Sequence, residues 1–493
     1  MESVLQQLTR GNALLFIVIL GIGGSFQSGY HLTSLSSPTP FIQNFINSSW
    51  YHRYQEVPHQ QSVTTIWSLV VSLYAVGGLL GSVSIKFITD VFGRKKGMIC
   101  SSLASVAAGA VVLLSKRVES FEMIIVARIL FGFSAGLGVY SHQMYLSEMS
   151  PRKIRGNVTM TSATFTTLGK LCGQLFGLSE MLGREQLWNV LLSVPACFSV
   201  LYLLLLPFIP EAPRYLFIEK GDEEGCRRAL QSLWGRGNFK QEMDEMLAEQ
   251  AAIDAARSRS PLQLLRDRTV RWQLLTLLVI VLCNQLSGMP VVNTFSFDIF
   301  QKAGIPADKI RYATLGLGVA ELFTSISCGL LIEHTGRRPL LWGAYGVLTV
   351  IWVVFTVLLN IQVSSLWSSY LSAALIVLLV VFFCGGPSTV TATLNSEIFV
   401  QSNRLAAFVV VGMERWLIFG LMGFVFPFLF TALDSFCFVI FACNCLLGSL
   451  YVFFVLPETK GKTLLQISQE FRAITVCGRS LSEEKAADVA TRL

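Results

Sequence analysis

The chain has 493 residues, of which 53% are hydrophobic and only 14% are charged, and its formal net charge is +7. A soluble protein usually carries about 25% charged residues, so this composition excludes an ordinary soluble domain and places most of the chain in a lipid bilayer. No basic tract interleaved with aromatic residues is present, so we do not expect nucleic acid as a partner.

Apolar segments long enough to cross the bilayer, about 20 residues each, recur along the chain. We expect twelve, at approximately 12–33, 63–88, 98–115, 121–145, 157–181, 186–209, 271–301, 311–332, 339–361, 369–396, 405–432 and 435–456. The first lacks a cleavage site and is read as a retained helix. The sequence therefore predicts an all-α membrane protein with two six-helix bundles, 1–210 and 271–456. A cytosolic helical linker, 211–270, joins them, and a cytosolic tail, 457–493, follows.

Basic residues cluster between alternate predicted helices, at 94–96, 152–155 and 337–338. Cytoplasmic loops are enriched in Lys and Arg, so we expect these loops and both termini in the cytosol of a multi-pass plasma-membrane protein. The large loop at 34–62 then faces outward. It contains Asn47 in an Asn-Ser-Ser acceptor sequence, which predicts glycosylation.

Eleven cysteines are scattered, mostly within apolar segments, and none forms a C-x-x-C motif. This pattern favours small apolar helix residues over disulfides or metal ligands. We therefore expect no metal and no cofactor. No catalytic constellation stands out, so an enzyme is not expected.

Short charged motifs occur twice in the chain, about 245 residues apart. They are D-x-x-G-R-K-K at 90–96 with E-x-x-G-R-R at 333–338, an E-x₆-R spacing at 148–155 and 397–404, and a Pro-Glu pair at 210–211 and 457–458. Two copies of one helical unit in the same order are typical of a transporter whose substrate site lies between the halves.

Charged residues held against helix ends can favour one orientation of two bundles. We expect a cytosolic gating cluster of salt bridges; the alternative is that these residues only set the topology. The candidates are Asp90, Arg94, Glu148, Arg155, Glu211, Glu333, Arg337, Arg338, Glu397, Arg404 and Glu458.

These motifs, with others over residues 10–472, resemble the sugar porter branch of the major facilitator superfamily, specifically the facilitative glucose transporter group. The others are F-Q-S-G-Y at 26–30, Y-L-S-E-M-S-P at 145–151, P-E-A-P-R-Y-L at 210–216, Q-L-S-G at 285–288 and P-E-T-K-G at 457–461. The chain is most similar to the fructose- and urate-moving branch, because Ala392 stands where glucose carriers have a tryptophan.

The resemblance implies a mid-membrane substrate site containing Gln174, Asn284, Gln285 and Trp416. Amides offer donors and an acceptor to sugar hydroxyls, and an indole offers an apolar face. For Gln285 the alternative is a hydrogen bond between helices. The family's usual asparagine after Gly288 is replaced by Met-Pro, so Pro290 is expected to kink the helix and Asn293 is the candidate replacement amide.

Charged residues depart from the family pattern in the same region: Lys170, Glu321, Glu414 and Arg415. A charge facing lipid at the bilayer centre costs at least about 2.5–3.5 kcal/mol, so these should face the cavity or one another. Pairing of a cation with a carboxylate would leave a neutral site for a sugar. An unpaired Lys170 and Arg415 would form a positive site for an anion such as urate, and relaxed function is a third reading.

His31, at the end of the first helix, is included among the site residues as a polar group near the cavity; proton coupling is not expected. The sequence predicts facilitative transport of a hexose by alternating access, with fructose ahead of glucose and a monomer sufficient. Its partners are the small solute, possibly urate, and the bilayer. The rivals are a non-transporting sugar sensor, which would usually carry a longer tail, and a cytosolic scaffold, for which the linker is short.

Overall fold

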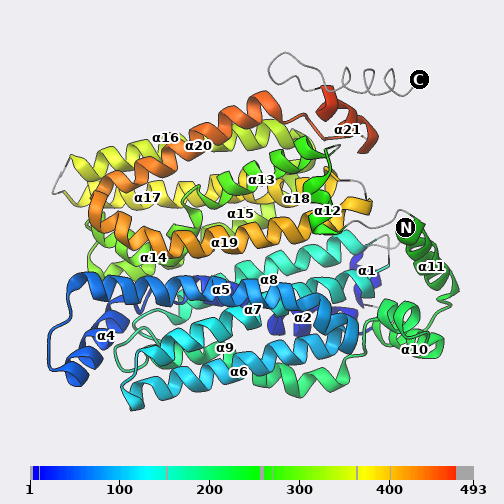
Figure 1. Ribbon diagram of the computed structural model, residues 1–493, viewed down its shortest axis with the longest axis horizontal. Coiled ribbons are helices and arrows are strands. Elements are labelled where there is room, and N and C mark those ends of the chain that lie inside the picture. Colours follow the sequence, from blue (N-terminus) through cyan, green and yellow to red (C-terminus); the bar gives the residue numbers. More distant parts are fainter. Residues whose placement is uncertain are drawn as a thin grey trace. The chain divides into compact units, whose positions relative to one another are not determined.

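The computed structural model describes residues 4–9, 11–151, 154–255, 260–268, 270–361, 365–399, 401–462 and 464–473, in which there are helices and no strand (Figure 1). The helices are α1 (Val4–Thr9), α2 (Ala13–Gly23), α3 (Ser25–Thr33), α4 (Thr39–Tyr54), α5 (Gln60–Phe92), α6 (Arg94–Val118), α7 (Glu122–Met149), α8 (Arg155–Phe176), α9 (Trp188–Leu205), η1 (Leu206–Phe208), η2 (Tyr215–Glu219), α10 (Glu223–Trp234), α11 (Lys240–Ala255), α12 (Pro261–Arg266), α13 (Arg271–Gln285), α14 (Met289–Lys302), α15 (Ala307–Thr335), α16 (Arg337–Asn360), α17 (Leu366–Phe383), η3 (Cys384–Ser388), α18 (Thr389–Glu397), α19 (Gln401–Leu433), η4 (Asp434–Phe436), α20 (Cys437–Val455) and α21 (Leu464–Ala473).

The chain divides into two compact units by contacts between backbone segments. Unit 1 comprises Met1–Ala252, Val291–Leu322 and Phe419–Ala432; unit 2 comprises Ile253–Pro290, Phe323–Ile418 and Leu433–Leu493. Helices α15 and α19 contribute to both units. This division follows packing, whereas the predicted boundaries at 210 and 270 follow the sequence repeat, and those boundaries stay a prediction.

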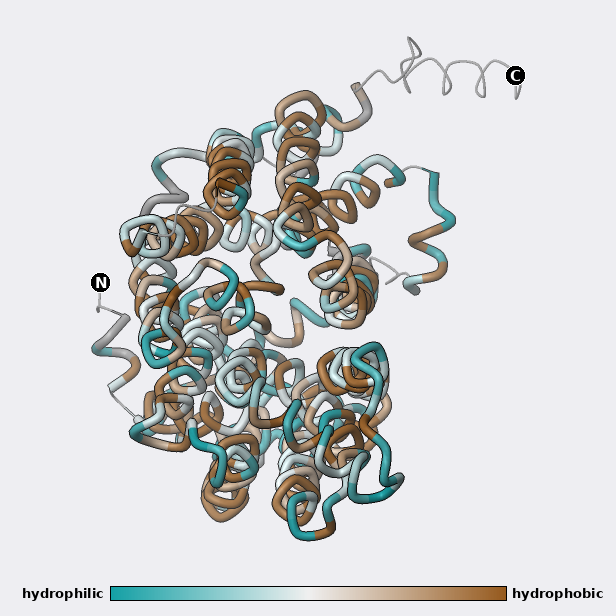
Figure 2. The backbone as a smooth tube through the Cα atoms, turned by 90° about the vertical axis from the view of Figure 1, so that its left-hand side faces the viewer, coloured by the Kyte–Doolittle hydropathy of each residue, from teal (hydrophilic) through white to brown (hydrophobic). Residues whose placement is uncertain are grey.

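Within the described residues, nine candidate segments are long and apolar enough to cross a membrane. One of them, Ala406–Val455, contains both most of α19 and all of α20. Two further long helices, α8 and α15, cover predicted spans but are not among the nine segments found in the described residues. Figure 2 shows the long helices as mainly hydrophobic, with hydrophilic residues concentrated in the segments that connect them.

In unit 1, α7 packs on both α5 and α6, α3 packs on α8, and α6 packs on α9. The linker helix α10 joins this core, because Leu230 and Leu233 are buried with apolar residues of α2. The indole of Trp234 donates a hydrogen bond to the carbonyl of Met149 at 2.9 Å. The first part of the predicted linker is therefore fixed to the end of α7.

In unit 2, α16 packs on α20 and on α17, as α6 packs on α9 and α7 in unit 1. The expected break in the seventh crossing lies between α13 and α14. Gly288 has a φ of +92°, and a Cβ there would lie 2.4 Å from the Trp352 ring, so only glycine fits. Pro290 is the second residue of α14, where a missing N–H is tolerated. The break thus precedes the proline.

Candidate functional site

The first copy of the charged motif joins four segments of unit 1. The Arg94 guanidinium lies 2.8 Å from the Glu148 carboxylate and 2.6 Å from that of Glu219. The Glu211 carboxylate accepts the backbone N–H of Lys95 at 3.0 Å, at the start of α6. An anion beside unpaired N–H groups at a helix N-terminus is stabilising, so Glu211 caps α6 while Arg94 ties α6 to α7.

The second copy repeats this arrangement in unit 2. The Arg337 guanidinium lies 2.9 Å from Glu397, which also accepts the hydroxyl of Thr459 at 2.8 Å. The Glu458 carboxylate accepts the backbone N–H groups of Arg337 and Arg338 at 3.0 and 3.1 Å, at the start of α16. Burial raises the pKa of Glu458, but four backbone N–H donors outweigh it and hold the pKa below its usual range.

Other members of the predicted gating cluster are placed differently. Asp90 is exposed at the end of α5 and has no ion pair among the described residues. Arg155 lies 3.2 Å from Glu249 on α11, and Arg214 lies 2.8 Å from the same carboxylate. Burial raises the pKa of Glu249, and the two arginines lower it by more, so the net shift is downward. Glu333 and Arg404 lie outside the residues whose side chains are described.

A buried ion pair joins α8 to α15 within unit 1. The Lys170 ammonium lies 2.7 Å from the Glu321 carboxylate, and the two side chains are only 14% and 7% exposed. At this distance the contact is both a hydrogen bond and an ion pair. Lys170 and Glu321 therefore neutralise each other between α8 and α15.

Gln174 lies one turn along α8 from Lys170 and packs against the backbone of α15. A Cβ at Gly318 would lie 1.8 Å from the Gln174 side-chain oxygen, so glycine permits this approach. That oxygen is buried and accepts no hydrogen bond from the described residues. Asn293 on α14 is half-buried. His31 is buried, with its ring 4.3 Å from that of Phe131.

The predicted site residues of unit 2 differ in how they are bonded. The amide nitrogen of Asn284 donates to the carbonyl of Pro387 at 3.1 Å and to the hydroxyl of Thr391 at 3.2 Å. Gln285, the next residue, is half-buried and its side chain has no hydrogen bond to the described residues. Arg415 and Trp416 are half-buried on α19. Gln285 is thus an available amide, and Asn284 is an occupied one.

At the start of α15, Arg311 forms a polar contact that no sequence motif predicts. Its guanidinium donates to the hydroxyl and the carbonyl of Ser37 at 2.9 and 3.1 Å and lies 5.3 and 5.4 Å from the rings of Phe41 and Phe297. Its next neighbour, Tyr312, donates a hydrogen bond to Glu180. The only signal in the sequence was a basic residue at the start of the predicted segment 311–332.

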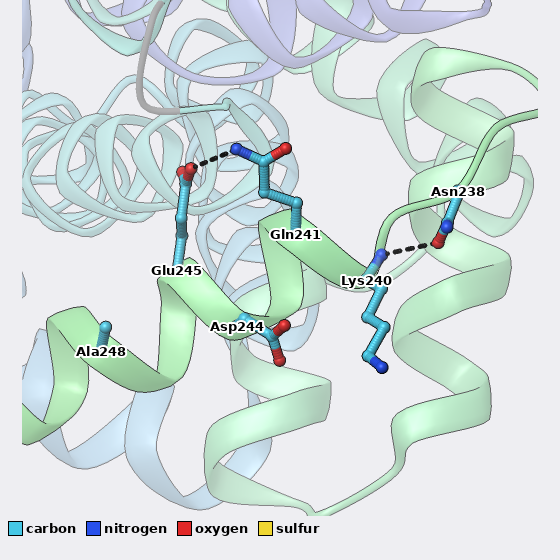
Figure 3. Close-up of a pocket in the computed structure, with 6 residues that line it drawn as sticks. All are labelled: Asn238, Lys240, Gln241, Asp244, Glu245 and Ala248. Atoms are coloured by element: carbon cyan, nitrogen blue, oxygen red, sulfur yellow. Dashed lines mark hydrogen bonds between the residues drawn. The ribbon is translucent and has the colours of Figure 1, made fainter.

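The surface of α11 carries a shallow hollow, lined by Asn238, Lys240, Gln241, Asp244, Glu245 and Ala248 (Figure 3). Gln241 donates to Glu245 at 3.3 Å, and the backbone N–H of Lys240 donates to Asn238 at 3.1 Å. Because neighbouring turns of one helix and the residues before it supply the whole lining, the hollow offers no converging groups for a ligand. Asn47, the predicted glycosylation site, is half-exposed within α4.

Long apolar helices in two units with equivalent packing, and polar or charged groups buried partway along them, define a membrane transport protein. The chain belongs to the sugar transporter family: the family model described as "Sugar (and other) transporter" matches residues 16–471. It is an integral, multi-pass membrane protein of the major facilitator superfamily, whose members carry small-molecule substrates.

Facilitated glucose transporter member 9 of solute carrier family 2 from Mus musculus is 40% identical over 449 residues, covering 91% of this chain and 84% of the relative. Member 11 from Homo sapiens is 40% identical over 471 residues, covering 95% of each chain. A structure of the xylose transporter XylE from E. coli, in an inward-open conformation, matches with a TM-score of 0.76 at 19% identity, covering 93% of this chain and 99% of that one. The structural match confirms the predicted major facilitator fold.

Proposed function

We propose that this protein is a facilitative uniporter for a hexose, with fructose preferred over glucose. It works by alternating access as a monomer in the plasma membrane, with both termini in the cytosol. The observation that carries this proposal is the buried contact between Lys170 and Glu321. Because the two charges cancel, the polar region around them favours a neutral solute over an anion.

Two amides, one in each unit, support a polyhydroxylated substrate. The buried oxygen of Gln174 lacks a donor, and the half-buried amide of Gln285 lacks partners among the described residues. A sugar hydroxyl can donate to the first and can both donate to and accept from the second. Ala392 is exposed on α18. By the family resemblance, glucose carriers have a tryptophan at this position, and the alanine favours fructose as the substrate.

Alternating access is supported by the equivalent charged contacts at the starts of α6 and α16. Each unit has an arginine paired with a glutamate and a second glutamate that caps the helix. We propose that these contacts stabilise one orientation of the transporter and must rearrange in the other. The basic residues beside them favour the cytosolic side for this end of the helices.

Uptake into liposomes that contain the purified protein tests the proposal. Labelled fructose should enter faster than glucose, without a proton gradient, and urate should enter slowly. Efficient urate uptake that is lost on changing Lys170→Ile and Arg415→Asn together would instead favour an anion transporter. Binding of hexose without uptake would favour a sensor, and either result would overturn the proposal.

A further inference from the structure

The tenth crossing is not a continuous α-helix, and its interruption lies beside Asn284. It runs as α17, the wide turn η3 and α18, with the sequence Cys-Gly-Gly-Pro-Ser in η3. Pro387 has no backbone N–H and cannot continue regular α-helical bonding. Wide turns of this kind bend helices and are frequent at functional positions. The helix therefore has a built-in point of bending at 384–388.

Both sides of this bend are held by neighbouring helices. On one side, a Cβ at Gly386 would lie 2.4 Å from the Ala344 side chain, so the turn is packed closely against α16. Across the turn, the hydroxyl of Thr389, the first residue of α18, donates to the carbonyl of Cys384 at 2.7 Å. On the other side, the Asn284 amide donates to the carbonyl of Pro387 and to the hydroxyl of Thr391.

Asn284 therefore connects two interruptions within unit 2. It lies at the end of α13, three residues before Ser287, whose carbonyl accepts the Trp352 indole N–H at 2.7 Å just before the Gly288 break. Its amide donates both of its hydrogens across to the bend in the tenth crossing. An amide that is 7% exposed and already donates twice can offer a solute only its carbonyl oxygen.

We propose that Asn284 is a positioning residue rather than a sugar ligand. It holds the η3 bend against the end of α13, so that bending of the tenth crossing and movement at the Gly288 break occur together, and it leaves Gln285 to contact the substrate. This proposal rests on the proposed transport function. It assigns Asn284 an effect on the rate of conformational exchange and Gln285 an effect on binding.

The two roles separate in a comparison of equilibrium binding with maximal transport rate. Asn284→Ala should lower the maximal rate of fructose transport roughly three- to tenfold, the effect of a lost buried hydrogen bond, with the dissociation constant within twofold of the wild type. Gln285→Ala should weaken binding instead. Binding is followed by quenching of tryptophan fluorescence, and transport is followed by uptake into liposomes.

Thr391 supplies a matched pair of variants at the other end of the link. Thr391→Val removes the acceptor with little change in shape, and Thr391→Ser keeps it. The Val variant removes one of the two bonds, so it should lose transport rate as Asn284→Ala does but by less, and the Ser variant should transport like the wild type. Equal transport rates in Thr391→Val and Thr391→Ser would overturn the proposal. So would a loss of binding affinity in Asn284→Ala as large as that in Gln285→Ala.

Hydrogen exchange provides a readout that does not depend on transport. Without the Asn284 link, backbone amides at 389–394 should exchange faster than in the wild type, and unchanged exchange would contradict the proposal. If the wild-type protein carries no hexose, the proposed function fails while this measurement still decides the role of Asn284. If Asn284→Ala does not fold, the Thr391 pair supplies both measurements.

Discussion

The buried contact between Lys170 and Glu321 makes a strong prediction about stability. Removing one partner of a buried ion pair leaves the other charge without compensation and costs about 3–5 kcal/mol, whereas replacing both with uncharged groups of similar size is nearly neutral. Lys170→Met leaves Glu321, which is 7% exposed, without its cation. Glu321→Gln leaves a lysine whose long side chain can reach toward water, so it should cost less.

A double-mutant cycle in detergent, read as the apparent Tm by intrinsic fluorescence, measures this difference. We expect the order Lys170→Met, then Glu321→Gln, then the double variant, from least to most stable, with the double variant near the wild type. Lys96→Met is the matched control, because Lys96 is exposed and has no ion pair among the described residues. The reasoning is refuted if Lys170→Met is as stable as this control, or if the double variant loses the sum of both single effects.

Three further outcomes are expected. Gln285→Ala should weaken hexose binding by about 1–3 kcal/mol, the cost of leaving a buried polar partner unpaired, and unchanged affinity in a binding titration would remove Gln285 from the site. Arg311→Ala should lower the apparent Tm more than Arg311→Lys, which keeps a donor for Ser37; equal values would show that the contact is not stabilising. The Glu458 carboxylate stabilises the fold fully above its unfolded pKa of about 4.3, because its folded pKa is lower, and this contribution is lost as the pH falls through the folded value. Glu458→Gln should therefore lower the Tm at pH 7, with a difference from the wild type that shrinks below about pH 4; a difference independent of pH would contradict the role of its charge.

The membrane class, the family and the helical architecture follow from the sequence because bilayer thickness and the positions of charged residues constrain them directly. The same constraint favours a partner for Lys170, since an unpaired charge in lipid is costly. The ion pairs of Glu219 with Arg94, and of Glu249 with Arg155 and Arg214, could not be predicted from this constraint. Both lie in or beside the linker, where no bilayer restricts the chain, and their partners are set by long-range packing.

The sequence also could not predict which hydrogen bonds each amide side chain makes. Asn284 and Gln285 are adjacent and chemically alike, and one residue of helical rotation turns them about 100° apart. That rotation directs Asn284 at the tenth crossing and leaves Gln285 without a partner among the described residues. A motif can place two amides near a site, but it cannot say which of them is already used by a neighbouring helix.

The polarity of α8 has a consequence for biosynthesis. Lys170 precedes Glu321 by 151 residues, so the ribosome completes α8 long before its counter-charge exists. A lysine at the bilayer centre costs the translocon at least about 2.5–3.5 kcal/mol. Within unit 1 the ion pair therefore forms only after α15 has been translated, when Glu321 becomes available to Lys170.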